Sequence, residues 1–329
     1  MTYFSRLLTQ VVVLCCLSVI PLSKGFSQDD DPAGIADMAS VEELYNRAGE
    51  LSLSGQYALA SLAFEKIFDL SGGKETLFED WGAQAGGFYF DYGMTLLPQE
   101  RWDEAKEAFT TSLDAAKIAE EVQTPIKNQN QRENLSRFQL GFVEAQVGNH
   151  AEAIRLYDLY LENNPPNAEL AQIRNSFKLN YGASQMALGQ TAEGTATIQE
   201  IFDNREAWQA TPQFLMQAVL SMGQGWIEEV NVAGNNQDLI ASIERRANAF
   251  LDKNVSAVRL SPVQSFGFGF VDRFRMLSVE SVKSGLYGLA LRYLSFTPTL
   301  EQVKQDIDLS LARLPVGADV PSQYQRLLD

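Results

Sequence analysis

The sequence predicts an all-helical protein made of successive pairs of antiparallel helices, and three observations lead to this prediction. From about residue 40 onward, apolar residues recur three and four positions apart, which is the period of an amphipathic α-helix. The alternation of apolar and polar residues that marks a β-strand is scarce, and Gly or Pro falls where one helix would give way to the next. In addition, four segments repeat the same order of small, turn-forming and bulky residues.

The first residues have the features of an export signal. Arg6 precedes a nearly continuous apolar run, Val11–Ile20, which Pro21 interrupts. This run is shorter than the ~20 residues that a membrane-spanning helix needs. Small residues follow at Gly25 and Ser27, two positions apart, as signal peptidase requires. We therefore expect cleavage near Ser27 and a periplasmic or extracellular mature chain; cleavage after Gly25 and retention as a membrane anchor are the alternatives.

The composition of the remaining chain excludes several kinds of partner. Both cysteines, Cys15 and Cys16, lie inside the leader, so the mature protein would form no disulfide. Losing the two positive charges of Arg6 and Lys24 would take the formal net charge from -16 to -18. A chain with this negative charge would repel the phosphates of a nucleic acid, so we expect no nucleic-acid partner. No later apolar run approaches membrane length, so we expect no stable membrane span in the mature chain.

Residues that begin helices occur at intervals along the chain. Ser40, followed three residues later by Glu43, forms a capping-box pattern at the first helix start. Thr211–Pro212 and Ser261–Pro262 each combine an N-cap residue with proline at the first helical position. The run Thr297–Thr299 predicts the start of a final helix.

Four segments align on a small residue in one helix, a turn residue seven positions later, and then a small and a bulky residue in the next helix. The aligned sets are Ala48, Gly55, Tyr57, Ala60, Phe64 and Ile67; Gly93, Glu100, Trp102, Ala105 and Phe109; Gly141, Gly148, His150, Ala153, Tyr157 and Tyr160; and Gly182, Gly189, Thr191, Gly194, Ile198 and Ile201. This pattern resembles the tetratricopeptide repeat family, in which small residues lie where two helices cross and large ones fill the space between hairpins. The resemblance covers residues 41–203 and is strongest over Leu140–Pro165.

The resemblance implies a right-handed superhelical solenoid of stacked helical hairpins. Successive small residues lie 45, 48 and 41 positions apart, whereas the family's usual repeat is ~34 residues, so longer helices or linkers are expected. Two degenerate hairpins follow, one around Gly234–Asn236 and one with Gly285, Tyr287, Ala290 and Leu294 in repeat-like order. The predicted organisation is a signal peptide at 1–27, an acidic disordered linker at 28–39, four repeat-like hairpins at 40–203, two degenerate hairpins at 204–296, and a capping helix with a tail at 297–329.

Residues suited to catalysis are sparse. His150 is the single histidine, and it takes the position that Tyr57 and Trp102 occupy in other repeats, so we expect it to pack as they do. No phosphate loop, metalloprotease motif or nucleophile elbow occurs in the sequence. Neighbouring carboxylates such as Glu228–Glu229 diverge on a helix, which leaves a carboxylate-based hydrolase as a remote alternative. We therefore expect that the protein is not an enzyme and that it binds neither a cofactor nor a metal ion.

A partner-binding surface is expected on the concave side, where the resemblance places the first helix of each pair. The positions three before and one after the small residue would face it, giving an apolar and aromatic stripe. Its residues are Tyr45, Gly49, Phe90, Met94, Phe138, Phe142, Leu179 and Ala183. The stripe would accept an extended segment or a helix of a protein partner; the alternative is that it is core, buried against the next hairpin.

The expected function is therefore that of an exported, non-catalytic scaffold that binds another protein or peptide. One alternative is an assembly factor for envelope or outer-membrane proteins, which rests on analogy. Another is a carbohydrate-binding helical protein, which would need its tryptophans, Trp81, Trp102, Trp208 and Trp226, to be exposed. The sequence does not indicate the oligomeric state.

Overall fold

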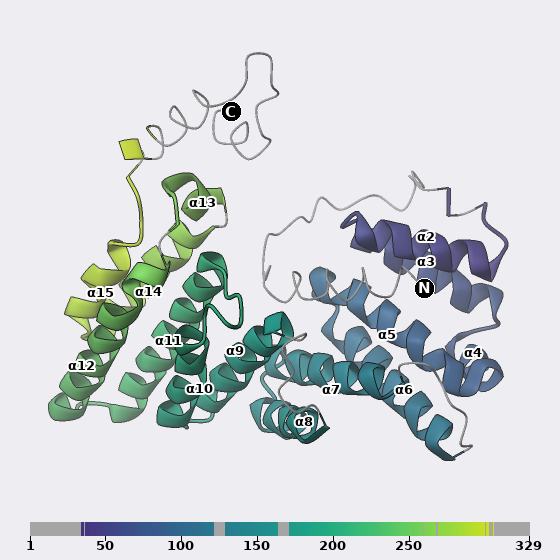
Figure 1. Cartoon of the computed structure of the whole chain (residues 1–329), viewed down its shortest axis with the longest axis horizontal. Helices are drawn as coiled ribbons and strands as arrows, with labels where there is room; N and C mark the ends of the chain where they lie inside the picture. The colour runs from purple at the N-terminus through teal and green to yellow at the C-terminus, as the bar shows by residue number, and fades with distance from the viewer. Residues whose placement is uncertain are drawn as a thin grey trace. The chain divides into compact units, whose positions relative to one another are not determined.

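The computed structural model describes residues 34–35, 37–121, 129–163, 171–258, 260–267, 269–299, 301–302 and 305. These residues contain helices and turns and no β-strand, which confirms the all-helical fold class for this part of the chain. The chain divides into two compact units, Met1–Ser184 and Gln185–Asp329, and each is described by itself (Figure 1). The predicted leader at 1–27 and most of the linker at 28–39 lie outside the described residues.

The first unit contains three packed helical pairs. Its helices are α2 (Val41–Leu53), α3 (Tyr57–Leu70), α4 (Lys74–Trp81), η1 (Gly82–Gln84), α5 (Ala85–Leu96), η2 (Leu97–Gln99), α6 (Trp102–Glu121), α7 (Gln129–Gln146), α8 (His150–Asn163) and most of α9 (Ala171–Ala187). Helix α2 packs on α3, α5 on α6, and α7 on α8, so the first three predicted hairpins are confirmed. Ser40 caps α2 as expected, because its Oγ accepts a hydrogen bond from the Glu43 amide at 3.4 Å.

The same turn joins α2 to α3, α5 to α6, α7 to α8, α9 to α10 (Thr191–Asp203), and α14 (Phe270–Lys283) to α15 (Tyr287–Leu294). The turn residue adopts a left-handed backbone, and the N–H that follows it bonds to the carbonyl five residues earlier, as in the Schellman motif. The φ angle is 78° at Gly55, 57° at Glu100, 85° at Gly148 and 79° at both Gly189 and Gly285. The turn positions aligned from the sequence therefore share one backbone conformation, including the position that carries glutamate.

Close helix crossings occur at the predicted small residues. A Cβ on Gly141 would lie 2.6 Å from Cε1 of Tyr157, and a Cβ on Gly93 would lie 2.8 Å from Cε1 of Phe109. Real Cβ atoms do not approach other heavy atoms this closely, so glycine is required for the ring to pack against the first helix. The resulting contacts bury both aromatic rings completely.

The unusual repeat length has two structural causes in the first unit. The short helix α4 and the 3₁₀ turn η1 are inserted between α3 and α5, after a turn in which Gly72 has a left-handed φ of 82°. Helix α6 runs for 20 residues, longer than α3 or α8. The sequence predicted extra length but not the helix α4.

Neighbouring hairpins of the first unit are joined by aromatic and ionic contacts. The ring of Phe64 packs edge-on against Phe88 with centroids 5.2 Å apart. Arg101, next to the second turn, bonds Glu65 of α3 at 2.8 Å and so ties the first hairpin to the second. The Lys106 ammonium on α6 pairs at 2.7 Å with the Glu144 carboxylate on α7.

The second unit continues the pattern of paired helices. It contains α10 (Thr191–Asp203), α11 (Pro212–Ala233), α12 (Gln237–Asn254), η4 (Val255–Val258), α13 (Pro262–Gly267), α14 (Phe270–Lys283) and α15 (Tyr287–Leu294). The fifth and sixth hairpins, α11–α12 and α14–α15, are present as predicted. Thr211 caps α11, and its Oγ1 accepts a hydrogen bond from the Phe214 amide at 3.2 Å.

The boundary between the units falls inside α9, whereas the sequence placed a boundary between residues 203 and 204. The end of α9 packs with the second unit: the Thr197 hydroxyl donates a 2.8 Å hydrogen bond to Gln185 Oε1. The Met186 side chain fills the space that a Cβ on Gly225 would need. These contacts connect the end of α9 to α10 and α11.

Within the second unit, hairpins are linked through backbone and side-chain hydrogen bonds. The Glu244 carboxylate on α12 accepts hydrogen bonds from the amides of Gly288 and Leu289, at 2.8 and 3.2 Å. It thereby gives partners to two N–H groups in the first turn of α15, which have none within the helix. Arg292 on α15 reaches back to Asp252 on α12 at 2.7 Å. Both contacts hold the last hairpin against its predecessor.

Replacing Gly141 by alanine should destabilise the fold by about 1–2 kcal/mol, because the new methyl group would force the Tyr157 ring out of its packed position. The matched control is Gly49→Ala on α2, where an added Cβ meets nothing within 4 Å and helix propensity favours alanine by up to ~1 kcal/mol. Urea-induced unfolding followed by circular dichroism measures both. Equal effects of the two substitutions would contradict the close crossing.

Replacing Glu100 by glycine should stabilise the fold by about 0.5–1 kcal/mol, because a left-handed backbone strains every residue with a Cβ. The converse substitution, Gly148→Ala, should lower the free energy of unfolding by about 1 kcal/mol. Thermal unfolding of the two variants would test the shared turn. A loss of stability in Glu100→Gly would show that contacts of the glutamate side chain outweigh the strain of the left-handed backbone at this position.

Candidate functional site

Half of the predicted stripe is core. Phe90, Met94, Phe138 and Leu179 are all buried, so the expectation that they line an open surface is wrong for these four. The two phenylalanine rings pack inside the helical layers. Phe90 contacts Phe109 of α6, the second helix of its own hairpin. Phe138 contacts Tyr157 and Tyr160 of α8 in its own hairpin and Phe177 of α9.

Tyr45 and Phe142 are the two aromatic residues of the predicted stripe that remain accessible. Tyr45 is 37% exposed and packs its ring against Phe64 and Phe88. Phe142 is half-buried, edge-on to Trp102. Gly49 and Ala183 are also half-buried. A binding role for these positions stays a prediction.

A polar cluster lies beside Tyr45 on the first helices of the first unit. The Tyr45 hydroxyl of α2 donates a 2.5 Å hydrogen bond to Oδ2 of Asp91 on α5. The Arg132 guanidinium of α7 lies against α5 where Gly87 has no side chain, because a Cβ there would be 2.9 Å from Arg132 Cζ. Gly87 and Asp91 are one helical turn apart, so three successive first helices contribute to one Tyr45–Asp91–Arg132 cluster.

Burial dominates the electrostatics of this cluster. Desolvation raises the pKa of the Asp91 carboxyl to about 6, although the Tyr45 hydrogen bond and the Arg132 charge act in the opposite direction. Burial and the neighbouring Asp91 carboxylate also raise the pKa of the Tyr45 phenol well above its ordinary value. At neutral pH the cluster therefore presents a neutral phenol, a carboxylate and a guanidinium.

Asp91 and Arg132 were missed by reasoning from the sequence, but a signal for Asp91 was present. It lies two residues before the small residue of its repeat, and the same position elsewhere holds Asn46, Gln139 and Asn180. A polar side chain recurs there beside apolar neighbours. Arg132 has no equivalent in the other repeats, and only the structure places it near Asp91.

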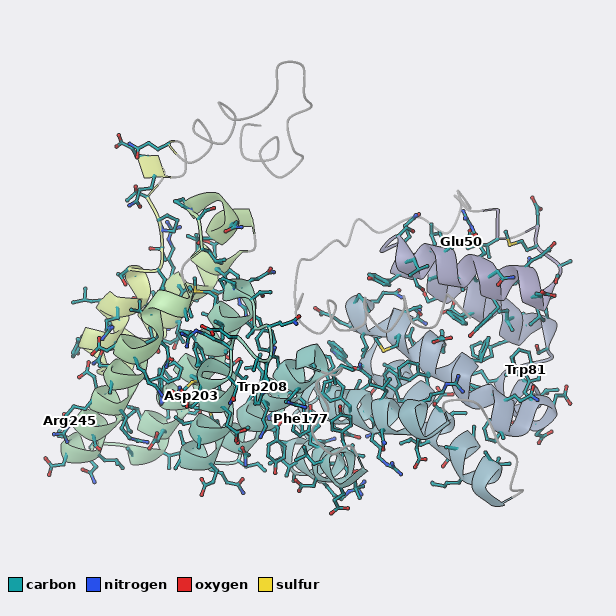
Figure 2. All side chains as sticks on the ribbon, viewed as in Figure 1. Glu50, Trp81, Phe177, Asp203, Trp208 and Arg245 are labelled. Atoms are coloured by element: carbon teal, nitrogen blue, oxygen red, sulfur yellow. The ribbon has the colours of Figure 1, made fainter. Side chains whose placement is uncertain are left out.

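The remaining candidate residues take structural positions. His150 is half-buried at the start of α8, as Tyr57 and Trp102 are at the starts of α3 and α6, and burial lowers the pKa of its imidazole. None of the four tryptophans is exposed: Trp226 is buried, and Trp81, Trp102 and Trp208 are half-buried. Figure 2 labels Trp81 and Trp208, and Trp81 packs edge-on against Phe88. The exposed aromatic platform that sugar binding would need is therefore not found at these tryptophans.

The described residues form neither a metal site nor a membrane-spanning helix. They contain no group of three or more His, Cys, Asp or Glu side chains arranged to hold a metal ion. None of the helices built from them is both long enough and apolar enough to cross a bilayer.

Comparisons with known proteins add little to this picture. No protein-family profile and no curated protein matches the chain. One solved structure, titled the crystal structure of the apo form of RapI, aligns with 84% of this chain and 86% of its own at 11% sequence identity, with a TM-score of 0.44.

Replacing Asp91 by asparagine should stabilise the protein at pH 8 by about 2 kcal/mol and have little effect near pH 4. The folded-state pKa of Asp91 is raised, so its contribution to stability is complete below the pKa of the unfolded chain and is lost as the pH rises through about 6. Asparagine keeps an oxygen that can accept the Tyr45 bond and cannot ionise.

Chemical unfolding of the parent and of Asp91→Asn between pH 4 and 8 measures this difference. Tyr45→Phe serves as the control, since loss of the hydrogen bond should raise the Asp91 pKa further. If the free energy of unfolding changes with pH in the same way for the parent and for Asp91→Asn, the pKa of the Asp91 carboxyl is not raised by folding.

Proposed function

We propose that this chain is an exported, non-catalytic scaffold that binds a segment of another protein on the first-helix face of its first unit. The observation that carries the proposal is the Tyr45–Asp91–Arg132 cluster, to which three successive hairpins contribute one side chain each. A segment lying across α2, α5 and α7 would meet a phenol, a carboxylate and a guanidinium in turn.

The chemistry of the cluster suits protein recognition. Tyrosine and arginine supply much of the binding energy in protein interfaces because they combine large contact area with directed hydrogen bonds. The Asp91 carboxylate can accept hydrogen bonds from backbone or side-chain N–H groups, and the Arg132 guanidinium can donate to carbonyl or carboxylate oxygens. Half-buried Phe142 lies on the same helix α7, ten residues after Arg132, where it packs edge-on against Trp102 of α6.

The charge of the chain indicates what kind of segment would bind. The formal net charge is -16, which attracts positively charged partners over distances of about a Debye length. We therefore propose that the bound segment is basic. Export is part of the same proposal and is supported by the apolar run Val11–Ile20 after Arg6.

A quantitative capture experiment tests this function. Residues 28–329 are immobilised as the parent, as Tyr45→Ala plus Arg132→Gln, and as the control Leu62→Ala, which alters an exposed residue on α3 of the same unit. We expect the double variant to lose at least tenfold in the amount of specifically captured partner, and the control to keep it, with unchanged circular dichroism for all three. Equal capture by the double variant would contradict the site.

The export component is tested separately. Mass spectrometry of the chain recovered outside the cytoplasm should show an N-terminus at Gln28 or, for the alternative site, at Phe26. An intact Met1 on a chain that stays in the cytoplasm would contradict export and leave the binding measurement unaffected.

A further inference from the structure

Arg273 on α14 is a half-buried cation that pairs with no carboxylate in the part of the chain that the structure describes. Its guanidinium Nη1 donates a 2.5 Å hydrogen bond to Oε1 of Gln217 on α11, which is its one bond to a described side chain. The adjacent Asp272 pairs with Arg275 instead. The chain has 42 acidic and 26 basic residues, so a missing counter-charge at this position has a local cause.

The part of α11 that contacts Arg273 supplies hydrogen-bonding groups and no charge. No Asp, Glu, Lys or Arg occurs in Pro212–Ile227. Gln213, Gln217 and Ser221 follow one another at intervals of four residues, so they share one side of the helix, and all three are half-buried. Apart from the bond to Arg273, none of these three side chains has a hydrogen-bond partner among the described residues. Their remaining donors are therefore available to a ligand.

The electrostatics of Arg273 reflect the missing counter-charge. Burial lowers the pKa of its guanidinium, because leaving water disfavours the charged form, and no described carboxylate opposes this effect. At Arg101 in the first unit, hydrogen bonds to Glu104 and Glu65 raise the guanidinium pKa instead. Arg273 remains charged at neutral pH, so it carries a partly desolvated charge, and a bound anion would offset the cost of that desolvation.

We propose that Arg273 and Gln217 bind a carboxylate group that a ligand presents to α11 and α14, the first helices of the two hairpins in the second unit. A guanidinium can donate two parallel N–H bonds to the two oxygens of a carboxylate, and Arg273 uses only Nη1 toward a described residue. Because Gln217 Oε1 accepts that bond, its Nε2 amide is left as a further donor beside the guanidinium. The Gln213 amide and the Ser221 hydroxyl lie one turn to either side on α11 and can donate as well.

A carboxylate matches this site better than a more highly charged anion. One guanidinium balances a single negative charge, whereas the net charge of -16 opposes the approach of doubly charged phosphate esters. The site also differs from the Tyr45–Asp91–Arg132 cluster of the first unit, where the protein itself supplies the carboxylate. Carboxylate binding at Arg273 is therefore a second function, independent of the binding of a basic segment to the first unit.

Arginine labelling of the whole chain tests the proposal. Phenylglyoxal reacts with accessible guanidinium groups, and peptide mapping by mass spectrometry gives the labelling rate of Arg273. The internal reference is Arg245, an exposed arginine on α12 that Figure 2 labels. Sodium acetate replaces sodium chloride at constant ionic strength. We expect acetate to slow the labelling of Arg273 by about threefold or more relative to Arg245, because a bound carboxylate occupies the guanidinium donors.

A matched pair of variants tests whether the site lies at Gln217. Gln217→Glu supplies a carboxylate from within the protein, so labelling of Arg273 should already be slow in chloride and should not respond to acetate. Gln237→Glu adds the same charge at the exposed start of α12 and should leave the acetate effect intact. Unchanged circular dichroism of both variants shows that the fold is kept.

A second probe identifies the source of the carboxylate. A short blocked peptide with one glutamate is compared with the same peptide carrying glutamine. Protection of Arg273 by the glutamate peptide at a lower concentration than acetate requires identifies a protein segment as the source, and equal or weaker protection identifies a small organic acid. If neither probe slows the labelling of Arg273 relative to Arg245, or if acetate still slows it in Gln217→Glu, the proposal is overturned.

Discussion

The close approach of a glycine in one helix to an aromatic ring in the next is the interaction on which the hairpins α5–α6 and α7–α8 depend. At Gly93 and Gly141 the facing ring atoms lie where a Cβ would otherwise be. This contact fixes how near the two helices lie and where the ring points. The ring then forms the surface on which the following hairpin packs, as Tyr157 does for Phe177. One small residue therefore determines packing both within a hairpin and between hairpins.

The sequence predicted this scaffold well because its determinants are local. Turn residues, caps and small residues act within a few positions of themselves, so their spacing predicted the pairs α2–α3, α5–α6, α7–α8, α11–α12 and α14–α15 and placed Glu100 at a turn. The helix α4 was not predicted, because Lys74–Trp81 is short and follows a glycine pair that reads as the end of a hairpin. The division inside α9 was also missed, since it depends on contacts of Gln185 and Met186 with residues 12 and 39 positions further along.

The binding face was predicted less well, and the reason is also physical. Whether Phe90 or Phe138 meets solvent depends on how the neighbouring helices pack around it, which spacing along the chain does not encode. Helix packing enclosed four of the eight predicted stripe residues and left Tyr45 and Phe142, with Gly49 and Ala183, at least partly accessible. The charged members of the cluster are long-range neighbours: Asp91 and Arg132 meet only because Gly87 lets a guanidinium lie on the backbone of α5. A half-buried carboxylate bonded to a phenol and near a guanidinium is costly for stability, which supports a role in recognition for that position.

The account requires that each hairpin be stabilised mainly by its immediate neighbours, through these ring contacts. Hydrogen–deuterium exchange on the Gly141→Ala variant measures this most directly. The account predicts faster amide exchange in α7 and α8 and in the adjoining α6 and α9, with α14 and α15 exchanging as in the parent. A uniform increase along the whole chain, or no change around α7 and α8, would contradict it.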